Sequence, residues 1–300
     1  MDTPRHIAHA SRGEDPRPLV AAAYAGPSPQ GDTFSPRRLG RHAFGVAAGC
    51  VLLLTLLPAG ALPAQPPPGS GTSQPFAQRA GSGPDSASYN QQRERMVEEQ
   101  VRRRGVAQPS LLSALKQVPR HLFVPEKNRN EAYEDRPVSL ESGQTLPQAY
   151  VSARMISLLG LKGGEKVLEI GTGSGYDSAL LSQLAAEVDS IEINRETGSR
   201  AQRLLRGLGY QNITVHIGDG YRGLPEKAPF DAILVTAAPQ KVPEPLFEQL
   251  AVGGRMVVAV GFSLHQDLQV ITKTEGGGRE VRRVSLINLA PMTGEVNQQN

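Results

Sequence analysis

Cysteine is almost missing from this chain of 300 residues, which has Cys50 and no other. The region after residue 62 therefore has neither a disulfide nor a thiol nucleophile. The six histidines, at positions 6, 9, 42, 121, 216 and 265, do not have the spacing of metal ligands, so we expect no metal site. The same region offers no Ser-His-Asp or Cys-His arrangement for nucleophilic catalysis.

The chain also has little excess charge of one sign. Its net charge is +3, and residues 1–62 carry six Lys or Arg against four Asp or Glu. The remaining body is therefore close to neutral, with a net charge of +1. A protein that binds nucleic acid through phosphate contacts would be more basic, so we expect no nucleic-acid partner.

The first third of the sequence differs from the rest in composition. Residues 1–42 are rich in Pro, Gly, Ala and Arg without sustained apolar periodicity, which predicts a disordered extension. An uncharged apolar run follows at 43–57, preceded by three arginines and ended by Pro58 and small residues. This layout is typical of a signal peptide, and the run is short for a membrane span.

Two interpretations of the segment 43–62 remain open at this stage. It either directs export or tethers the protein to a membrane, or it belongs to a non-functional extension that arises from an upstream start codon. Residues 63–88 are a Pro/Gly/Ser linker, and we expect the folded domain over 89–300. Localisation is accordingly cytoplasmic in one interpretation and extracytoplasmic or membrane-bound in the other.

The body begins with a predicted helical addition and continues with alternating strands and helices. Asn90 is predicted to cap a helix to Arg104, and Ser110 a second helix to about Val118. An extended piece at 121–125 and a loop over 126–147 precede a helix at 149–159. The predicted strands are 166–170, 188–193, 213–217, 230–236, 255–260, 267–274 and 281–290, and the helices between them are 176–186, 195–207 and 243–251.

This alternation predicts an α/β fold with a doubly wound, mostly parallel sheet and helices on both faces. The last two strands are joined by Gly276-Gly277-Gly278, which predicts a C-terminal β-hairpin. A sheet of this kind binds its ligand at the carboxyl ends of the strands, near the point where the strand order reverses.

One stretch organises the body: an apolar strand that ends in Gly171-Thr172-Gly173-Ser174-Gly175 and leads directly into a helix. Glycine allows positive φ and lets the backbone approach a ligand at a helix N-terminus. The spacing G-x-G-x-G is not that of a dinucleotide phosphate cradle, and Glu169 would repel a pyrophosphate. The stretch therefore favours a ligand with an amino acid or sulfonium end over NAD.

Three carboxylates, Glu169, Glu192 and Asp219, follow or end successive predicted strands. Those ends are neighbours in a doubly wound sheet, so we expect the three to line one crevice. Glu192 is placed to accept hydrogen bonds from two ribose hydroxyls, Asp219 to meet an adenine amino group, and Glu169 to bind an ammonium directly or through water.

These motifs resemble those of S-adenosylmethionine-dependent methyltransferases, and the body over about 90–296 resembles protein-L-isoaspartate O-methyltransferases more narrowly. The supporting stretches are 118–124 (VPRHLFV), 132–135 (AYED), 143–145 (GQT), 167–176 (VLEIGTGSGY), 218–220 (GDG), 228–239 (APFDAILVTAAP) and 291–294 (PMTG). The resemblance implies a Rossmann-like methyltransferase fold and S-adenosyl-L-methionine as cofactor.

The resemblance further implies methylation of the α-carboxylate of L-isoaspartyl residues in damaged proteins and peptides, which starts their repair. A monomer is expected. The cofactor-binding residues carried over are Glu169, Gly171, Thr172, Gly173, Gly175, Glu192, Asp219, Gly220 and Thr293. Gln144 and Thr145 are expected to bind the substrate carboxylate. That carboxylate is ionised at neutral pH, so catalysis needs alignment and no general base.

One residue departs from the family pattern. Pro147 occupies the position of the family's active-site serine, and Ala149 that of its proline. Thr145, with Pro147 at the serine position, forms the predicted catalytic pair, and the hydroxyls of Thr145 and Ser142 are the candidate substitutes. The departure motivates an alternative function, a non-catalytic binder of S-adenosylmethionine or of damaged peptide. An NAD-dependent oxidoreductase is disfavoured by the glycine spacing and by Glu169.

Overall fold

The computed structural model describes residues 84–262 and 265–298. The predicted extension 1–42, the apolar segment 43–62 and the linker up to residue 83 lie outside the described residues. Among the helices within the described ranges, none is long and apolar enough to cross a membrane.

Seven strands form the main sheet in the order β5-β4-β3-β6-β7-β8-β9. The strands from β5 to β7 are parallel neighbours, and β8 and β9 are antiparallel. Their bounds are β3 (Lys166–Ile170), β4 (Glu187–Glu192), β5 (Ile213–Ile217), β6 (Phe230–Val235), β7 (Leu250–Phe262), β8 (His265–Lys273) and β9 (Arg279–Ile287). The predicted doubly wound, mostly parallel sheet with a C-terminal hairpin is confirmed.

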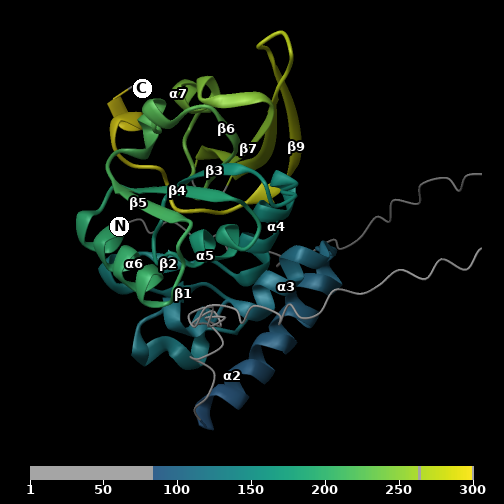
Figure 1. Ribbon diagram of the computed structural model, residues 1–300, viewed down its shortest axis with the longest axis vertical. Coiled ribbons are helices and arrows are strands. Elements are labelled where there is room, and N and C mark those ends of the chain that lie inside the picture. Colours follow the sequence, from purple (N-terminus) through teal and green to yellow (C-terminus); the bar gives the residue numbers. More distant parts are fainter. Residues whose placement is uncertain (1–83, 263–264, 299–300) are drawn as a thin grey trace, which may run out of the picture. The chain divides into compact units, whose positions relative to one another are not determined.

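Helices cover both faces of this sheet (Figure 1). The helices are α2 (Pro84–Arg95), α3 (Pro109–Gln117), α4 (Ala149–Leu159), α5 (Tyr176–Ser182), α6 (Arg195–Gly207) and α7 (Glu244–Glu248). Along β3, Val167 packs into the core beneath α3, α4 and α5, whereas Leu168 and Ile170 pack into the core beneath α7. The central strand is therefore buried on both faces, as its apolar sequence requires.

The N-terminal helical addition differs from the prediction in its boundaries. Helix α2 begins at Pro84, continues into a π-helical turn (Met96–Val101) and a 3₁₀ turn (Arg102–Arg104), and ends at Gly105. Asn90 lies inside α2 and accepts a hydrogen bond from Arg93 at 2.5 Å, so its prediction as a cap is wrong. A capping residue and an interior asparagine look alike in sequence when the preceding residues are also helical.

Three other predicted boundaries also change. Helix α3 begins at Pro109, so Ser110 is not its cap. The piece predicted as extended forms a 3₁₀ turn over Arg120–Phe123. Strand β7 begins at Leu250, earlier than predicted, because the chain leaves the short helix α7 directly into the sheet.

The segment predicted as a loop over 126–147 contains a small hairpin. Strands β1 (Val138–Ser139) and β2 (Thr145–Leu146) pair antiparallel, with Ser139 opposite Thr145. A 3₁₀ turn (Glu141–Gly143) joins them, and the Leu140 amide donates to the Gln144 carbonyl at 2.8 Å. The hairpin gives this otherwise irregular segment a fixed backbone, which carries Gln144 and Thr145 at its end.

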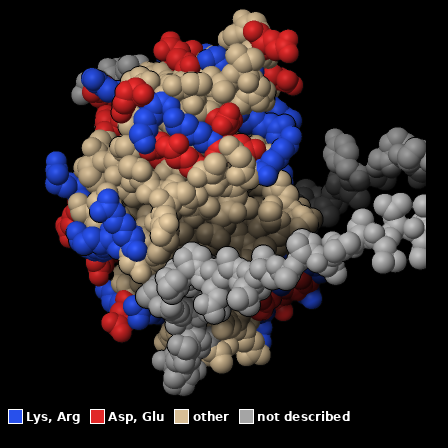
Figure 2. Space-filling view, viewed as in Figure 1, with Lys and Arg blue, Asp and Glu red and all other residues tan. Residues whose placement is uncertain are grey.

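Charged side chains of both signs are interspersed over the face of the molecule seen in Figure 2. This agrees with the near-neutral charge of the body. On that face no single sign of charge dominates, and the electrostatic argument for a ligand site has to come from the interior of a cavity instead.

Candidate active site

A cavity of about 490 Å³ opens at the carboxyl ends of β3, β4 and β6. Its volume lies within the range of small-molecule sites. The chain passes from β3 outward to β5 and then returns to β6 on the other side of β3, so the cavity lies at the switch point of the sheet. The predicted site residues that line it are Gln144, Thr145, Pro147, Gly171, Thr172, Gly173, Glu192, Gly220 and Thr293.

The Gly-rich turn forms the floor of the cavity between β3 and α5. Gly171 has a φ of +97°, and a Cβ at that position would lie 2.5 Å from Oγ1 of Thr236. The Thr236 hydroxyl donates to the carbonyl oxygens of Ile170 and Gly171, at 2.9 and 2.8 Å. The turn thus packs tightly against β6, and only glycine fits at its first position.

Gly175 has a different task from the one predicted for it. It does not line the cavity, and a Cβ there would press on the Leu205 side chain at 3.1 Å. It caps α5 with a φ of +88° and lets α6 pack closely against the turn. The third glycine of the motif therefore serves packing within the fold.

Glu192 ends β4 and faces the cavity with a carboxylate held in place by the backbone. Its Oε2 accepts from the Gly173 amide at 2.9 Å, and its Oε1 accepts from the Asn194 amide at 3.0 Å. Each oxygen keeps a further lone pair for a ligand. This arrangement links the end of β4 to the Gly-rich turn.

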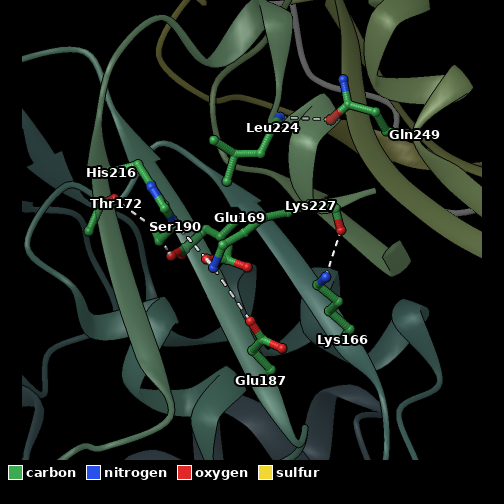
Figure 3. A network of polar contacts seen from close by, with 10 residues as sticks. Lys166, Glu169, Thr172, Glu187, Ser190, His216, Leu224, Lys227 and Gln249 are labelled. Carbon is green, nitrogen blue, oxygen red and sulfur yellow. Dashed lines mark hydrogen bonds and ion pairs between the residues drawn. The ribbon is translucent and has the colours of Figure 1, made fainter. Parts of the chain in front are cut away.

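Glu169 does not line the cavity, so its predicted contact with a ligand ammonium is not supported. The period-two alternation of β3 turns its side chain toward α5, where it is fully buried. Ser190 donates to its Oε2 at 2.6 Å, and Ser178 donates to the same oxygen. Thr172 and Ser190 share a further hydrogen bond of 2.5 Å, which connects Glu169 to the Gly-rich turn (Figure 3).

The burial of Glu169 has an electrostatic consequence. Desolvation, helped by the nearby Asp177 and opposed by the two serine hydroxyls, raises its pKa to about 8. The carboxyl therefore holds its proton at neutral pH and cannot neutralise a cation. It acts as a buried brace for the turn.

Asp219 lies beside the cavity but is not among the lining residues. Its Oδ1 accepts from the Tyr221 amide at 2.9 Å, and its Oδ2 accepts from the Glu295 amide at 2.7 Å. Gly220, the next residue, does line the cavity. The structure thus uses Asp219 to fasten the C-terminal segment near Thr293, and its contact with an adenine stays a prediction.

The opposite wall of the cavity consists of the β1–β2 hairpin and the C-terminal segment. Gln144, Thr145 and Pro147 line it from one side, and Thr293 from the other. The C-terminal segment is attached by Ala238, whose amide donates to the Ala290 carbonyl and whose carbonyl accepts from the Met292 amide, both at 2.8 Å. The residues predicted to hold the substrate are therefore brought together across the cavity from the Gly-rich turn.

Arg120 is a site residue that the sequence did not reveal as one. It is completely buried, its Nε donates to the Ala132 carbonyl at 2.7 Å, and its Nη2 donates to the Pro147 carbonyl. Its guanidinium carbon lies 4.8 Å from the centre of the Tyr176 ring. Arg120 fixes the backbone at the position of the missing serine, and the only sequence signal was its place in the motif VPRHLFV.

Asp177 was not among the predicted residues either. It lies in the first turn of α5 and lines the cavity, where it and Glu192 are the only acidic lining residues among those that the structure describes. Within the same described ranges, no Lys or Arg lines this cavity. Two carboxylates without a basic side chain disfavour a pyrophosphate and suit a ligand that carries positive charge.

Known proteins of one family resemble this chain in sequence and fold. The model of the family described as protein-L-isoaspartate(D-aspartate) O-methyltransferase matches residues 91–297. A protein-L-isoaspartate O-methyltransferase of Gloeobacter violaceus is 47% identical over 206 residues, which are 68% of this chain and 100% of that relative. One of Syntrophus aciditrophicus is 48% identical over 198 residues, 66% of this chain and 91% of that relative.

A solved structure named protein-L-isoaspartate O-methyltransferase has the same fold. It superposes with a TM-score of 0.58 at 29% identity, and the match covers 69% of this chain and 68% of the other. The resemblance found in the sequence is thereby confirmed over the region that contains the cavity. The chain belongs to the protein-L-isoaspartate(D-aspartate) O-methyltransferase family.

Proposed function

We propose that this protein transfers the methyl group of S-adenosyl-L-methionine to the α-carboxylate of L-isoaspartyl residues in damaged proteins and peptides. The observation that carries the proposal is the pair of facing walls in one cavity. The Gly-rich turn and Glu192 form one wall, and Gln144, Thr145 and Pro147 form the other. Family membership supplies the reaction, and the cavity supplies a place for both of its reactants.

The lining residues fit the cofactor. Gly173 has no atom within 4 Å of the position of a Cβ, so its backbone lies open to the cavity. Glu192 offers free lone pairs for ribose hydroxyls, and Gly171, Thr172 and Gly220 shape the space around them. When bound, S-adenosylmethionine supplies an electrophilic methyl group on a sulfonium. Thr293 closes the same space from the C-terminal segment.

The substrate wall needs only to position its ligand. The pKa of an unperturbed α-carboxyl group is about 3.5, so it is ionised at neutral pH and no base is required. Gln144 and Thr145 are the polar side chains of the hairpin that line the cavity, and we assign them the contacts with the substrate carboxylate. Thr145 is exposed to the cavity and can donate its hydroxyl hydrogen to a carboxylate oxygen.

Pro147 is compatible with activity. Its side chain contributes no hydroxyl, but Arg120 holds its carbonyl and so fixes the backbone of the substrate wall. Alignment of the nucleophile depends on this fixed backbone as well as on individual hydrogen bonds. The non-catalytic binder is therefore the less favoured function. The serine hydroxyl is absent, but the fixed backbone of the loop can still position the substrate.

The test is a methyl-transfer assay on one isoaspartyl peptide, with the peptide that contains normal aspartate at the same position as the control. We expect transfer to the isoaspartyl peptide and none to its aspartyl twin. Binding of S-adenosylmethionine without any transfer to the isoaspartyl peptide would support the binder instead. Binding of NAD in place of S-adenosylmethionine would overturn the proposal.

We also propose that residues 43–62 direct this protein out of the cytoplasm or hold it at a membrane, ahead of a linker and a methyltransferase domain. The support is the apolar run with its basic flank and small residues. A reporter fused after residue 62 should leave the soluble cytoplasmic fraction. Recovery of the reporter in that fraction alone would favour a cytoplasmic enzyme with a non-functional extension.

A further inference from the structure

Asp177 is the least explained charged group of the cavity. It follows the Gly-rich turn by two residues, in the first turn of α5. Its Oδ1 is shielded from solvent without a hydrogen-bond partner. A buried carboxylate oxygen without a partner costs free energy, so a group kept in this state calls for a ligand or a structural reason.

The neighbours of Asp177, Ser152 and Arg120, compensate its carboxylate only in part. The buried Arg120 nearby directs its Nε and Nη2 to the carbonyls of Ala132 and Pro147, and its Nη1 has no hydrogen-bond partner among the described residues. Burial raises the pKa of Asp177, although Ser152 and Arg120 lie near enough to oppose the rise. The protein alone therefore stabilises the ionised form of this side chain only in part, and a cation in the cavity that Asp177 lines would stabilise that form further.

The order of the strands indicates which part of a ligand meets Asp177. Gly220 follows β5, Glu192 ends β4, and the Gly-rich turn leads from β3 into α5. A nucleoside assigned to Gly220 and Glu192 lies toward the β5 and β4 side of the cavity. The group attached to its ribose then extends toward β3, where Asp177 is the acidic lining residue.

We propose that Asp177 binds the α-ammonium group of the methionine part of S-adenosylmethionine, the position that the sequence alone assigned to Glu169. The proposal rests on the proposed function for the identity of the ligand. Glu169 is closed off behind the strand by Ser178 and Ser190, whereas Asp177 lines the cavity itself. A charge-assisted bond to an ammonium would satisfy this carboxylate.

The experiment compares two ligands that differ only at the methionine end. S-adenosylhomocysteine carries the amino acid group, and 5′-methylthioadenosine lacks it but keeps the adenosine and the thioether. Calorimetry of the full chain measures both dissociation constants in the wild type, in Asp177→Asn and in Glu192→Gln. Asparagine keeps the shape of Asp177 and removes its charge, and Glu192→Gln is the matched control at the ribose end.

We expect Asp177→Asn to weaken S-adenosylhomocysteine about tenfold to a hundredfold and to change 5′-methylthioadenosine by less than about twofold. Glu192→Gln should weaken both ligands alike. The melting temperature of unliganded Asp177→Asn should equal or exceed that of the wild type, because the variant removes a buried charge. This result separates a binding residue from one that only supports the fold.

Three results would overturn the proposal. Equal loss of both ligands in Asp177→Asn, together with a lower melting temperature, would make the residue structural. Unchanged affinity of Asp177→Asn for S-adenosylhomocysteine would show that another group binds the ammonium. A wild type that binds neither ligand would refute both the proposed function and this inference. If Asp177→Asn selectively loses affinity for S-adenosylhomocysteine but the wild type transfers no methyl group, the inference holds and the proposed function is refuted.

Discussion

The two walls of the cavity are built in different ways. The strand wall consists of the Gly-rich turn, Glu192 and Gly220, which lie at the carboxyl ends of parallel strands. Hydrogen bonds from backbone amides and from buried serines hold this wall in place. The loop wall consists of the C-terminal segment and the β1–β2 hairpin, whose strands have two residues each. The hairpin is fastened by the buried Arg120 at Pro147 and by an exposed ion pair between Arg200 and Glu141.

This difference suggests that the walls divide the work. The strand wall is part of the fold, so its geometry is set before any ligand arrives, and it suits a cofactor that every reaction cycle uses. The loop wall depends on a few side-chain contacts, which is typical of segments that adapt to substrates and open at low cost. We therefore expect variants of the strand wall to change stability and cofactor affinity, and variants of the loop wall to change substrate use.

The largest effect should come from the buried brace of the strand wall. Glu169→Gln keeps the size of the side chain and removes a carboxyl whose pKa is raised to about 8. In the wild type the unfolded chain loses this proton near its ordinary pKa, while the folded chain keeps it. Folding stability is therefore lost between about pH 4.5 and pH 8, and the variant avoids this loss.

The measurement for Glu169→Gln is urea unfolding at pH 5 and pH 8.5. The free energy of unfolding of the variant minus that of the wild type should grow by about 3–5 kcal/mol between these conditions, at 1.36 kcal/mol per pKa unit. A difference that does not change with pH would show that Glu169 is ionised in the folded protein. Its role as a neutral brace would then be wrong.

The second effect concerns the cofactor. Glu192→Ala removes the carboxylate of the strand wall and should weaken S-adenosylmethionine by roughly 1.5–3 kcal/mol, through loss of charge-assisted bonds to ribose. Isothermal calorimetry with the full chain measures this directly. Affinity equal to that of the wild type would show that Glu192 does not bind the cofactor. The proposed division of roles between the two walls would then be contradicted.

The third effect belongs to the loop wall. Pro147→Ser restores a hydroxyl at the position of the family serine while Arg120 still has the backbone carbonyl to hold. The new bond to a charged substrate group should raise kcat/KM for an isoaspartyl peptide about tenfold, mainly through a lower KM. Loss of the proline's restriction on the backbone opposes part of this gain. Steady-state kinetics at saturating cofactor measures it, and a lower kcat/KM would show that proline itself is needed.

The smallest effect tests the exposed fastening of the hairpin. Arg200 of α6 pairs with Glu141 in the turn between β1 and β2, and also with Glu196 at 3.2 Å. Both groups of the first pair are about half exposed, so Arg200→Gln should cost no more than about 1 kcal/mol. We expect a rise of about two- to fivefold in the peptide KM that disappears in high salt.

Arg203→Gln is the matched control for this prediction, because Arg203 lies on the same helix and is exposed. It should leave the peptide KM unchanged. An equal rise of KM in both variants would assign the effect to the general charge of α6 and not to the contact with Glu141.

The sequence predicted part of the strand wall for a physical reason. The Gly-rich turn and Glu192 follow from local spacing at strand ends, and the parallel sheet then brings them together without further information. The orientation of Glu169 could not be predicted in the same way. It sits one residue before the strand end, and which face it points to depends on the register of the whole sheet.

Residues of the loop wall depend on contacts between distant segments. Arg120 reaches Pro147 across 27 residues, and nothing in the sequence around either one predicts that contact. The start of α2 at Pro84 was missed because Asn90 has the residue type of a cap but lies within a longer helix. Local spacing therefore predicted the turn and Glu192, and the family resemblance predicted the lining residues of the loop wall. The support from Arg120 and the orientation of Glu169 needed the three-dimensional arrangement.

The most direct test of the division between the walls measures two constants in the same two variants. The constants are the dissociation constant of S-adenosylhomocysteine and the KM for an isoaspartyl peptide at saturating cofactor, and the variants are Glu192→Ala and Pro147→Ser. We predict that Glu192→Ala changes the first constant at least tenfold and the second by less than about twofold. Pro147→Ser should lower the second constant severalfold and change the first by less than about twofold. Parallel changes in both constants in either variant would contradict the account.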